Sequence, residues 1–208
     1  MSGRILIDLF ITLDGVSQAP GGPEEDPEGG FEFGGWQAPL ITGGDGDLIM
    51  RGIRSTDALL LGRRTYDIFA AFWPRQLDGS DAEIARKFDE IPKYVASRGT
   101  PELGWRDSHL VGADLAAEID ALRERHSETH VIGSIDFART LIAESLFDEL
   151  NLWVYPIVLG RGKRLFGADG PPRGLVLLDL PVADAGAVLL RYGPTGEVPA
   201  TGDMAPQS

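Results

Sequence analysis

The sequence predicts a single α/β domain with a mostly parallel central sheet and antiparallel strands at its C-terminal end. Up to about residue 145, short apolar runs alternate with amphipathic segments of helical period, which is the pattern of parallel βα units. After Asp148 the strand-like segments follow one another without a helix between them, as antiparallel pairs do. A chain of 208 residues can bury about 70% of its unfolded surface in one core, and no internal repeat or second domain is visible.

Four strands and five helices are expected in the first part of the chain. The strands are short runs rich in leucine, isoleucine and valine, and the helices carry apolar residues three or four positions apart, such as Ile84 and Phe88. The expected strands are 5–11, 56–61, 93–97 and 129–132, and the expected helices are 45–54, 64–72, 81–90, 113–126 and 134–145.

The last part of the chain is expected to add strands only. Residues 150–155 alternate loosely, 156–162 form an apolar bend with two glycines, and 175–180 and 187–192 are close enough to pair as antiparallel strands. The predicted domain therefore covers residues 1–192. The tail 193–208 has little to bury, and we expect it to be frayed.

Residues 13–39 predict a long loop between the first strand and the first helix. The segment is rich in glycine and proline, and structureless loops of this length in compact domains are usually lids or binding loops, or are disordered. Its aromatic residues Phe31, Phe33 and Trp36 favour a loop that packs on the domain.

Composition excludes several classes of function. The net charge of −13 argues against a nucleic-acid partner, because binding to phosphate backbones needs a clustered excess of Lys and Arg. The absence of cysteine excludes disulfides, thiolate catalysis and cysteine-ligated metals. No apolar run is long enough to span a membrane and no secretion signal is visible, so we expect a cytoplasmic protein without a membrane partner.

Two predicted strands end in a glycine that opens directly into a helix, at Leu61-Gly62-Arg63-Arg64-Thr65-Tyr66 and at Val131-Ile132-Gly133-Ser134-Ile135. Such a junction directs unpaired backbone N–H groups and the positive end of the helix dipole toward one spot, which suits an anion. The alternative is an ordinary turn in which Thr65 or Ser134 helps to cap its helix. A third basic turn, Ser97-Arg98, also follows a strand, and three such sites at strand ends suit a ligand with several phosphates.

Four segments resemble the dihydrofolate reductase-like family, and within it the RibD C-terminal domain, the reductase domain of riboflavin biosynthesis. They are Thr12–Gly15, Leu61–Tyr66, Val131–Ser134 and Leu146–Phe166, and together they span residues 4 to about 192 in the family's order. The last segment is the most specific. The resemblance implies the three-layer dihydrofolate reductase-like fold.

The resemblance also implies a cofactor, NADPH, and residues that bind it. Gly62, Arg63 and Thr65 match the turn that binds the pyrophosphate and the adenosine phosphate. Ser97 and Arg98 match the turn that reads the 2′-phosphate, and Gly133, Ser134 and Ile135 match the turn under the nicotinamide. Many relatives have Gly-Gly where this chain has Gly133-Ser134.

Two aspartates are candidate catalytic residues. Asp14 follows the first strand and is interpreted either as a substrate-binding or proton-handling carboxylate or as an Asp-Gly turn residue. Asp47 roughly matches the acidic residue of folate-reducing relatives, or it stabilises a helix N-terminus. The loop with Trp36 resembles a mobile lid over cofactor and substrate, and the alternative is a static plug.

Other chemistry is weakly indicated. His126, Glu128 and His130 lack a further ligand for a metal site, so we expect no metal. Ser134 lacks the Gly-x-Ser-x-Gly motif of serine hydrolases. The segment Gly160–Arg164 either contacts a substrate phosphate or forms a turn between strands.

The expected function is an NADPH-dependent reductase of a small heterocyclic substrate, since the nicotinamide itself carries the hydride chemistry. The family suggests 5-amino-6-(5-phosphoribosylamino)uracil, although the deaminase half is not in this sequence. The alternatives are dihydrofolate reduction and a non-catalytic nucleotide-binding protein. Family members often dimerise, and the apolar segment Trp153–Leu159 is either core or the interface of a homodimer.

Overall fold

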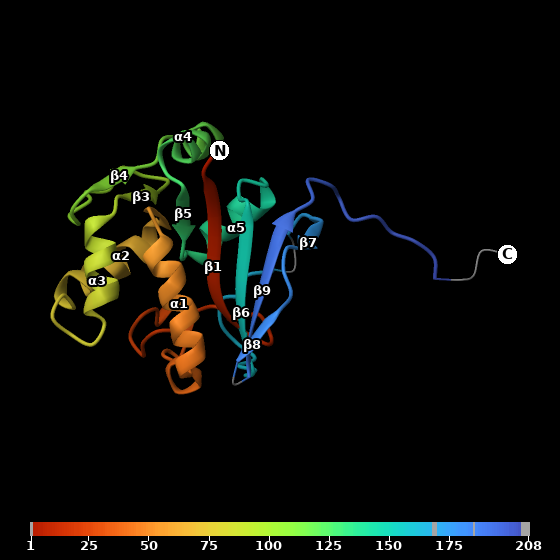
Figure 1. The fold of residues 1–208 in the computed structure, drawn as a ribbon, viewed down its shortest axis with the longest axis horizontal. Coiled ribbons are helices and arrows are strands. Elements are labelled where there is room, and N and C mark those ends of the chain that lie inside the picture. Colours follow the sequence, from red (N-terminus) through yellow and green to blue (C-terminus); the bar gives the residue numbers. More distant parts are fainter. Residues whose placement is uncertain (1, 168–169, 185, 205–208) are drawn as a thin grey trace.

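The central feature of the computed structural model, which describes residues 2–167, 170–184 and 186–204, is one twisted sheet (Figure 1). In the described residues its strand order is β4-β3-β2-β5-β1-β6-β9-β7, and β8 pairs with β9. The strands from β4 to β6 are parallel, and β7, β8 and β9 are joined by antiparallel pairing. The mixed α/β fold with a mostly parallel sheet is confirmed.

The strands are β1 (Arg4–Thr12), β2 (Ala58–Gly62), β3 (Lys93–Ala96), β4 (Ser108–Leu110), β5 (Glu128–Val131), β6 (Glu149–Tyr155), β7 (Leu175–Leu177), β8 (Val182–Asp184) and β9 (Ala187–Pro194). The helices are α1 (Gly43–Ser55), α2 (Arg63–Phe72), α3 (Ala82–Glu90), α4 (Leu115–Arg125) and α5 (Ile135–Ala143).

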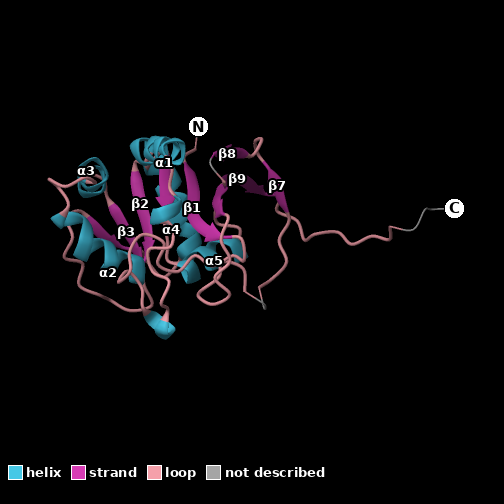
Figure 2. Ribbon diagram, turned by 90° about the horizontal axis from the view of Figure 1, so that it is seen from below, coloured by secondary structure: helices cyan, strands magenta, loops and turns pink. Residues whose placement is uncertain are grey.

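Helices cover both faces of the sheet, which gives three layers (Figure 2). Alternate residues of β1, among them Ile5, Ile7 and Leu9, pack with α4 and α5 in the largest core cluster. On the other face, Leu59 and Leu61 of β2 pack with α1, α2 and α3 in a second cluster. Because successive side chains of a strand point to opposite faces of the sheet, each buried strand residue packs against the helices of one layer only.

The structure differs from the expected elements at the sheet edges and at α1. Strands β4 and β8, of three residues each, were not expected, and the strand expected at 175–180 ends at Leu177. Helix α1 begins at Gly43, two residues before the expected start. Strand β9 extends to Pro194, and Thr195 N–H donates to the Gly174 carbonyl at 3.0 Å, so the ordered sheet runs slightly past residue 192.

Residues 13–39 form an irregular segment that is packed on the domain; one 3-10 turn, Glu28–Gly30, lies within it and a second, Ala38–Leu40, overlaps its end. Phe31 and Trp36 are buried together with Val16, Trp153 and Tyr155. The expectation that the aromatic residues of this loop pack on the domain is met for Phe31 and Trp36, whereas Phe33 is exposed.

Candidate functional site

The two glycine turns predicted from the sequence lie against each other at the carboxyl ends of the neighbouring strands β2 and β5. Gly62 N–H donates to the Gly133 carbonyl at 3.0 Å. A Cβ atom built on Gly62 would lie 2.1 Å from Ser134 Oγ, and one built on Gly133 would lie 2.7 Å from Thr65 Oγ1. The peptide bond between Gly133 and Ser134 is cis. Gly62 therefore needs glycine because of close approach between the turns, and Gly133 needs it also because its φ is +137°.

The helices that follow these turns begin without a side-chain cap. Gly62 is the N-cap residue of α2 and Ser134 that of α5, and neither helix has a side-chain hydrogen bond at its N-cap. The capping role considered for Thr65 and Ser134 is therefore not observed. The unpaired N–H groups in the first turns of α2 and α5 therefore point toward the same edge of the sheet, and such an arrangement of helix N-termini binds anions.

The third basic turn continues this edge. Gly62 of β2 is paired with Ala96 of β3, so Ser97 and Arg98 follow immediately beside the first turn. Arg98 is exposed, and Ser97 Oγ accepts a hydrogen bond from Gly99 N–H at 3.2 Å. Arg63 Nε donates to both oxygens of Asp67 at 2.7 Å. The turns after β3, β2 and β5 thus line one edge, and together they are called the glycine edge below.

Asp14 joins the end of β1 to the segment after β6. Its carboxylate accepts hydrogen bonds from Thr12 Oγ1 at 2.6 Å, Leu159 N–H at 3.1 Å, Gly160 N–H at 2.9 Å and Arg164 Nη2 at 3.1 Å. Partial burial raises the pKa of Asp14, but these hydrogen bonds outweigh it and hold the pKa well below its usual range. The carboxylate therefore joins the end of β1 to the segment that follows β6, and the catalytic role of Asp14 stays a prediction.

Asp47 lies on the exposed side of α1. Because the helix begins at Gly43, Asp47 is its fifth residue and lies beyond the first turn, where the helix dipole has its strongest effect. The structure therefore weakens the dipole interpretation. The catalytic role of Asp47 stays a prediction.

Trp36 is held by several contacts. Its ring packs edge-on against Tyr155 with a centroid distance of 5.7 Å, and its Nε1–H donates to the Gln18 carbonyl at 2.9 Å. The loop is also joined to α2 and to the 160–164 segment by ion pairs, because Arg64 and Lys163 both contact Glu28. These contacts favour the static plug over the mobile lid.

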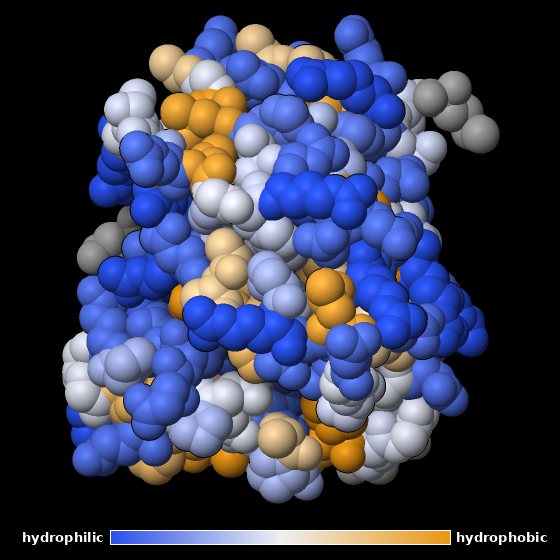
Figure 3. Space-filling view, turned by 90° about the vertical axis from the view of Figure 1, so that its left-hand side faces the viewer, coloured by the Kyte–Doolittle hydropathy of each residue, from blue (hydrophilic) through white to orange (hydrophobic). Residues whose placement is uncertain are grey.

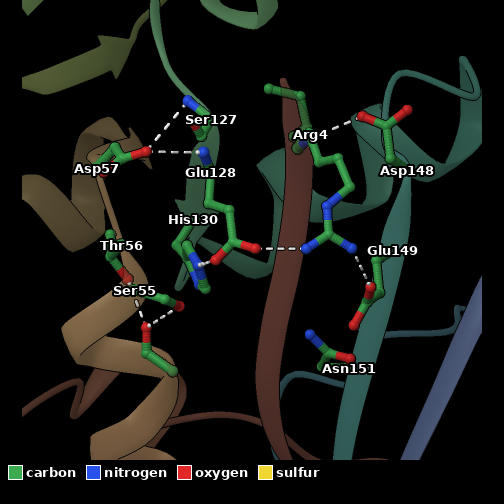
Figure 4. Close-up of polar contacts among 12 residues, drawn as sticks. Arg4, Ser55, Thr56, Asp57, Ser127, Glu128, His130, Asp148, Glu149 and Asn151 are labelled. Carbon is green, nitrogen blue, oxygen red and sulfur yellow. Dashed lines mark hydrogen bonds and ion pairs between the residues drawn. The ribbon is translucent and has the colours of Figure 1, made fainter. Parts of the chain in front are cut away.

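A polar cluster on the α1-facing side of the sheet was missed by sequence reasoning. Asp8 Oδ2 accepts a hydrogen bond from His130 Nδ1 at 2.7 Å, and Asp8 Oδ1 accepts one from Asn151 Nδ2 at 2.8 Å. Arg4 lies between Glu128 and Glu149 on the same face (Figure 4). The available signal was Asp8 itself, the one polar residue in the run 5–11.

His126 and His130, the pair considered for a metal, have separate partners. His126 Nε2 lies 2.9 Å from the Tyr94 hydroxyl, whereas His130 bonds to Asp8. Within the described parts of the chain no group of three His, Cys, Asp or Glu side chains has the placement of a metal site. In the same described ranges, no helix is both long enough and apolar enough to cross a membrane.

Comparisons with known proteins agree with the fold. Over 170 residues, covering 78% of this chain and 80% of the relative, the chain is 26% identical to the uncharacterized protein YyaP of Bacillus subtilis (strain 168). A putative riboflavin biosynthesis protein from Shewanella sp. PV-4 has a similar structure, with a TM-score of 0.68 and 20% identity over 92% of this chain and 99% of that one. Dihydrofolate reductase from Enterococcus faecalis superposes with a TM-score of 0.54 and 15% identity over 94% and 98% of the two chains.

The family comparison covers nearly all of the sheet. The profile described as the RibD C-terminal domain matches residues 4–188, from the first residue of β1 into β9. The fold is therefore of the dihydrofolate reductase-like type, and the chain belongs to the RibD C-terminal domain family.

Proposed function

We propose that this chain is an NADPH-dependent reductase of a small heterocyclic substrate. The observation that carries the proposal is the glycine edge, where two uncapped helix N-termini and the exposed Arg98 come together. Backbone N–H groups suit the pyrophosphate, and an arginine suits a phosphate monoester. In this proposal the pyrophosphate and the nicotinamide of NADPH are bound by Gly62, Thr65 and the turn Gly133–Ile135. The phosphates on the adenosine side are bound by Arg63, Ser97 and Arg98.

The test compares the melting temperature of the protein with NADPH and with NADH. A ligand at 100 times its Kd stabilises the folded state by about 2.7 kcal/mol, which is about 5–10 °C for a chain of this size. We expect NADPH to give this rise at about a millimolar and NADH to give less. No rise with either nucleotide would contradict the proposed cofactor.

A variant pair tests the 2′-phosphate assignment. Arg98→Ala removes a charge-assisted contact, so NADPH affinity should fall about ten- to hundredfold while NADH affinity changes little. Arg125→Ala is the matched control, because Arg125 ends α4 at the amino edge of the sheet and donates to the Ala121 carbonyl. Equal losses of NADPH and NADH affinity in Arg98→Ala would refute the assignment.

Assays with different substrates distinguish the proposed function from its alternatives. NADPH oxidation with 5-amino-6-(5-phosphoribosylamino)uracil supports the riboflavin-type reaction, and oxidation with dihydrofolate supports folate reduction. Binding of NADPH without oxidation by either acceptor would favour another substrate or a non-catalytic nucleotide-binding protein.

The proposal includes a homodimer formed through the β7–β8 side of the sheet. Leu177, Leu178, Leu180 and Val182 are exposed there. The opposite end, with β4, is mostly hydrophilic (Figure 3). Light scattering should give twice the chain mass for the wild type and for the control Leu110→Glu, which alters an exposed apolar residue on β4, and the single mass for Leu180→Glu. A monomeric wild type would refute the homodimer.

A further inference from the structure

Tyr66 lies in the first turn of helix α2 and has no role in cofactor binding as proposed above. Its side chain is buried, with 2% of its surface exposed, yet it carries a hydroxyl group that a phenylalanine in the same place would lack. That hydroxyl accepts a hydrogen bond from the backbone N–H of Trp105 at 3.0 Å. A buried hydroxyl needs such a partner, so the tyrosine indicates a specific connection between α2 and the β3–β4 loop, residues 97–107, which contains Trp105.

Both ends of the β3–β4 loop are fixed to the same part of α2. The loop begins with the turn Ser97–Arg98 of the glycine edge. Just before this turn, Ala96 is paired with Gly62, the N-cap residue of α2. Near the end of the loop, Trp105 is bonded to Tyr66, which follows that N-cap by four residues. The N-terminal turn of α2 therefore holds the loop on either side of its exposed middle part.

Arg98 depends on the loop backbone for its position. In the described parts of the chain its side chain makes no hydrogen bond and no ion pair, whereas Arg63 is paired with Asp67. The backbone of residues 98–104 also makes no hydrogen bond to any described residue outside the loop. Beyond Arg98, the loop backbone is thus first held by a hydrogen bond at Trp105.

Trp105 is a well-defined end point for this part of the loop, because contacts from three elements hold it. Besides the bond to Tyr66 on α2, its Nε1–H donates to Asp89 Oδ1 on α3 at 3.1 Å, and Lys93 Nζ on β3 lies 4.4 Å from its ring centroid. Lys93 Nζ in turn donates to the carbonyls of Phe88 and Asp89 near the end of α3. Of these three contacts to Trp105, the one from Tyr66 bonds its backbone and comes from the helix whose N-terminus forms part of the glycine edge.

We infer that Tyr66 is a positioning residue for the 2′-phosphate: its hydroxyl fixes the β3–β4 loop to the first turn of α2, and this sets the distance between Arg98 and the N–H groups of that turn. The inference rests on the proposed function, in which Arg98 binds the 2′-phosphate and the N-terminus of α2 binds the pyrophosphate. Both phosphate groups belong to one ligand, so a loop held in place presents Arg98 at the required distance without a further loss of entropy. NADH has no 2′-phosphate, so its affinity should not depend on this contact.

The experiment measures the affinities of the full chain for NADPH and for NADH by isothermal titration calorimetry, in the wild type and in Tyr66→Phe. The variant keeps the buried ring and removes the acceptor for Trp105 N–H. We expect its NADPH affinity to fall about three- to tenfold, while its NADH affinity changes by less than about twofold. The matched control is Phe69→Leu, three residues further along α2, which removes ring contacts with Trp73 and Phe88. It should lower the melting temperature and leave the ratio of the two affinities unchanged.

A second variant and a second measurement keep the test independent of whether Tyr66→Phe folds. Asp89 accepts hydrogen bonds from Trp105 Nε1 and Arg106 Nη1, so Asp89→Ala frees the same end of the loop from α3 and should also lower the NADPH-to-NADH affinity ratio. Hydrogen exchange followed by NMR needs no nucleotide. The Trp105 amide should exchange slowly in the wild type and at least about tenfold faster in Tyr66→Phe.

The affinity ratio separates this inference from the proposed function. If the wild type prefers NADPH and Tyr66→Phe keeps the same ratio, the inference is overturned and the proposed function stands. A parallel loss of affinity for both nucleotides would give Tyr66 a structural role alone and would overturn the inference as well. A wild type that binds neither nucleotide would refute the proposed function, and the inference with it.

Discussion

Replacement of Gly62 by alanine tests the contact on which the glycine edge depends. Gly62 has φ −66° and ψ 147°, which any residue adopts without strain, so the effect of the substitution is steric. The new Cβ would lie 2.1 Å from Ser134 Oγ, 2.9 Å from Ser134 N and 3.0 Å from Phe137 Cβ. The hydroxyl can rotate away, but the backbone nitrogen must move by about 0.5 Å to reach an ordinary contact of about 3.4 Å.

Overpacking of this kind costs about 1–3 kcal/mol, which lowers the melting temperature by about 2–12 °C in a chain of this length. NADPH affinity should fall in parallel, because the two turns proposed to bind it are pushed apart. Gly52→Ala is the matched control: Gly52 lies inside α1 with open space around its Cβ position, so the same substitution should raise stability by about 0.5–1 kcal/mol. Differential scanning calorimetry measures both. A Gly62→Ala protein that melts with the wild type would refute the close approach of the turns.

Three further predictions follow from buried contacts. Asp14→Asn should lower the free energy of unfolding at pH 7 by about 1–3 kcal/mol, because four donors lose a charged acceptor. Because the pKa of Asp14 is lower in the folded state, its ionised carboxylate stabilises the fold above the unfolded pKa of about 3.9, and this stabilisation is lost as pH falls through the folded pKa. Urea titrations in acid should therefore show a free energy of unfolding that depends less on pH in Asp14→Asn than in the wild type. An unchanged pH dependence would contradict this. Burial lowers the pKa of Lys93 to about 8, so the unfolded chain binds more protons between about pH 8 and 10.4, and stability should rise across this range in the wild type but not in Lys93→Met. Trp36→Ala should cost about 3–5 kcal/mol if the loop is a static plug, whereas an unchanged melting temperature would favour the mobile lid.

The parts of the fold that could be predicted from the sequence are those with a local hydrophobic signal. Strand β2 is a continuous apolar run, and residues 5–11 of β1 are apolar apart from Asp8, because both faces of these strands are covered. Strands β4 and β8 have three residues each, and His109, Leu110, Val182 and Ala183 in them are exposed, so no periodic pattern marks these strands. The start of α1 was missed because its first residues are Gly-Gly-Asp-Gly, a poor helix former, and packing of Leu48 and Ile49 on the loop cluster supports the helix instead.

In the candidate site, too, the parts with a local sequence signal could be predicted and the others could not. The glycine turns are visible in the sequence because each is a short motif that ends a strand and opens a helix. The Asp8–His130 contact joins residues 122 positions apart, and its Asn151 arm joins residues 143 positions apart. A period-2 pattern places Asp8 on one face of β1, but it does not say which strands lie beside β1 or what they carry. The partners of Asp8 depend on strand order, and strand order is set by the whole sheet.

The glycine edge and the Asp8 cluster are constrained by different interactions, and this affects which of their residues can differ between members of the family. At the glycine edge the limit is backbone contact, so any Cβ on Gly62 or Gly133 disturbs both turns at once. At the Asp8 cluster the limits are hydrogen bonding and charge balance, and a different balanced set of side chains can meet them without moving a strand. We therefore expect proteins of this fold to keep the turns and to differ at the positions of Asp8, His130 and Asn151.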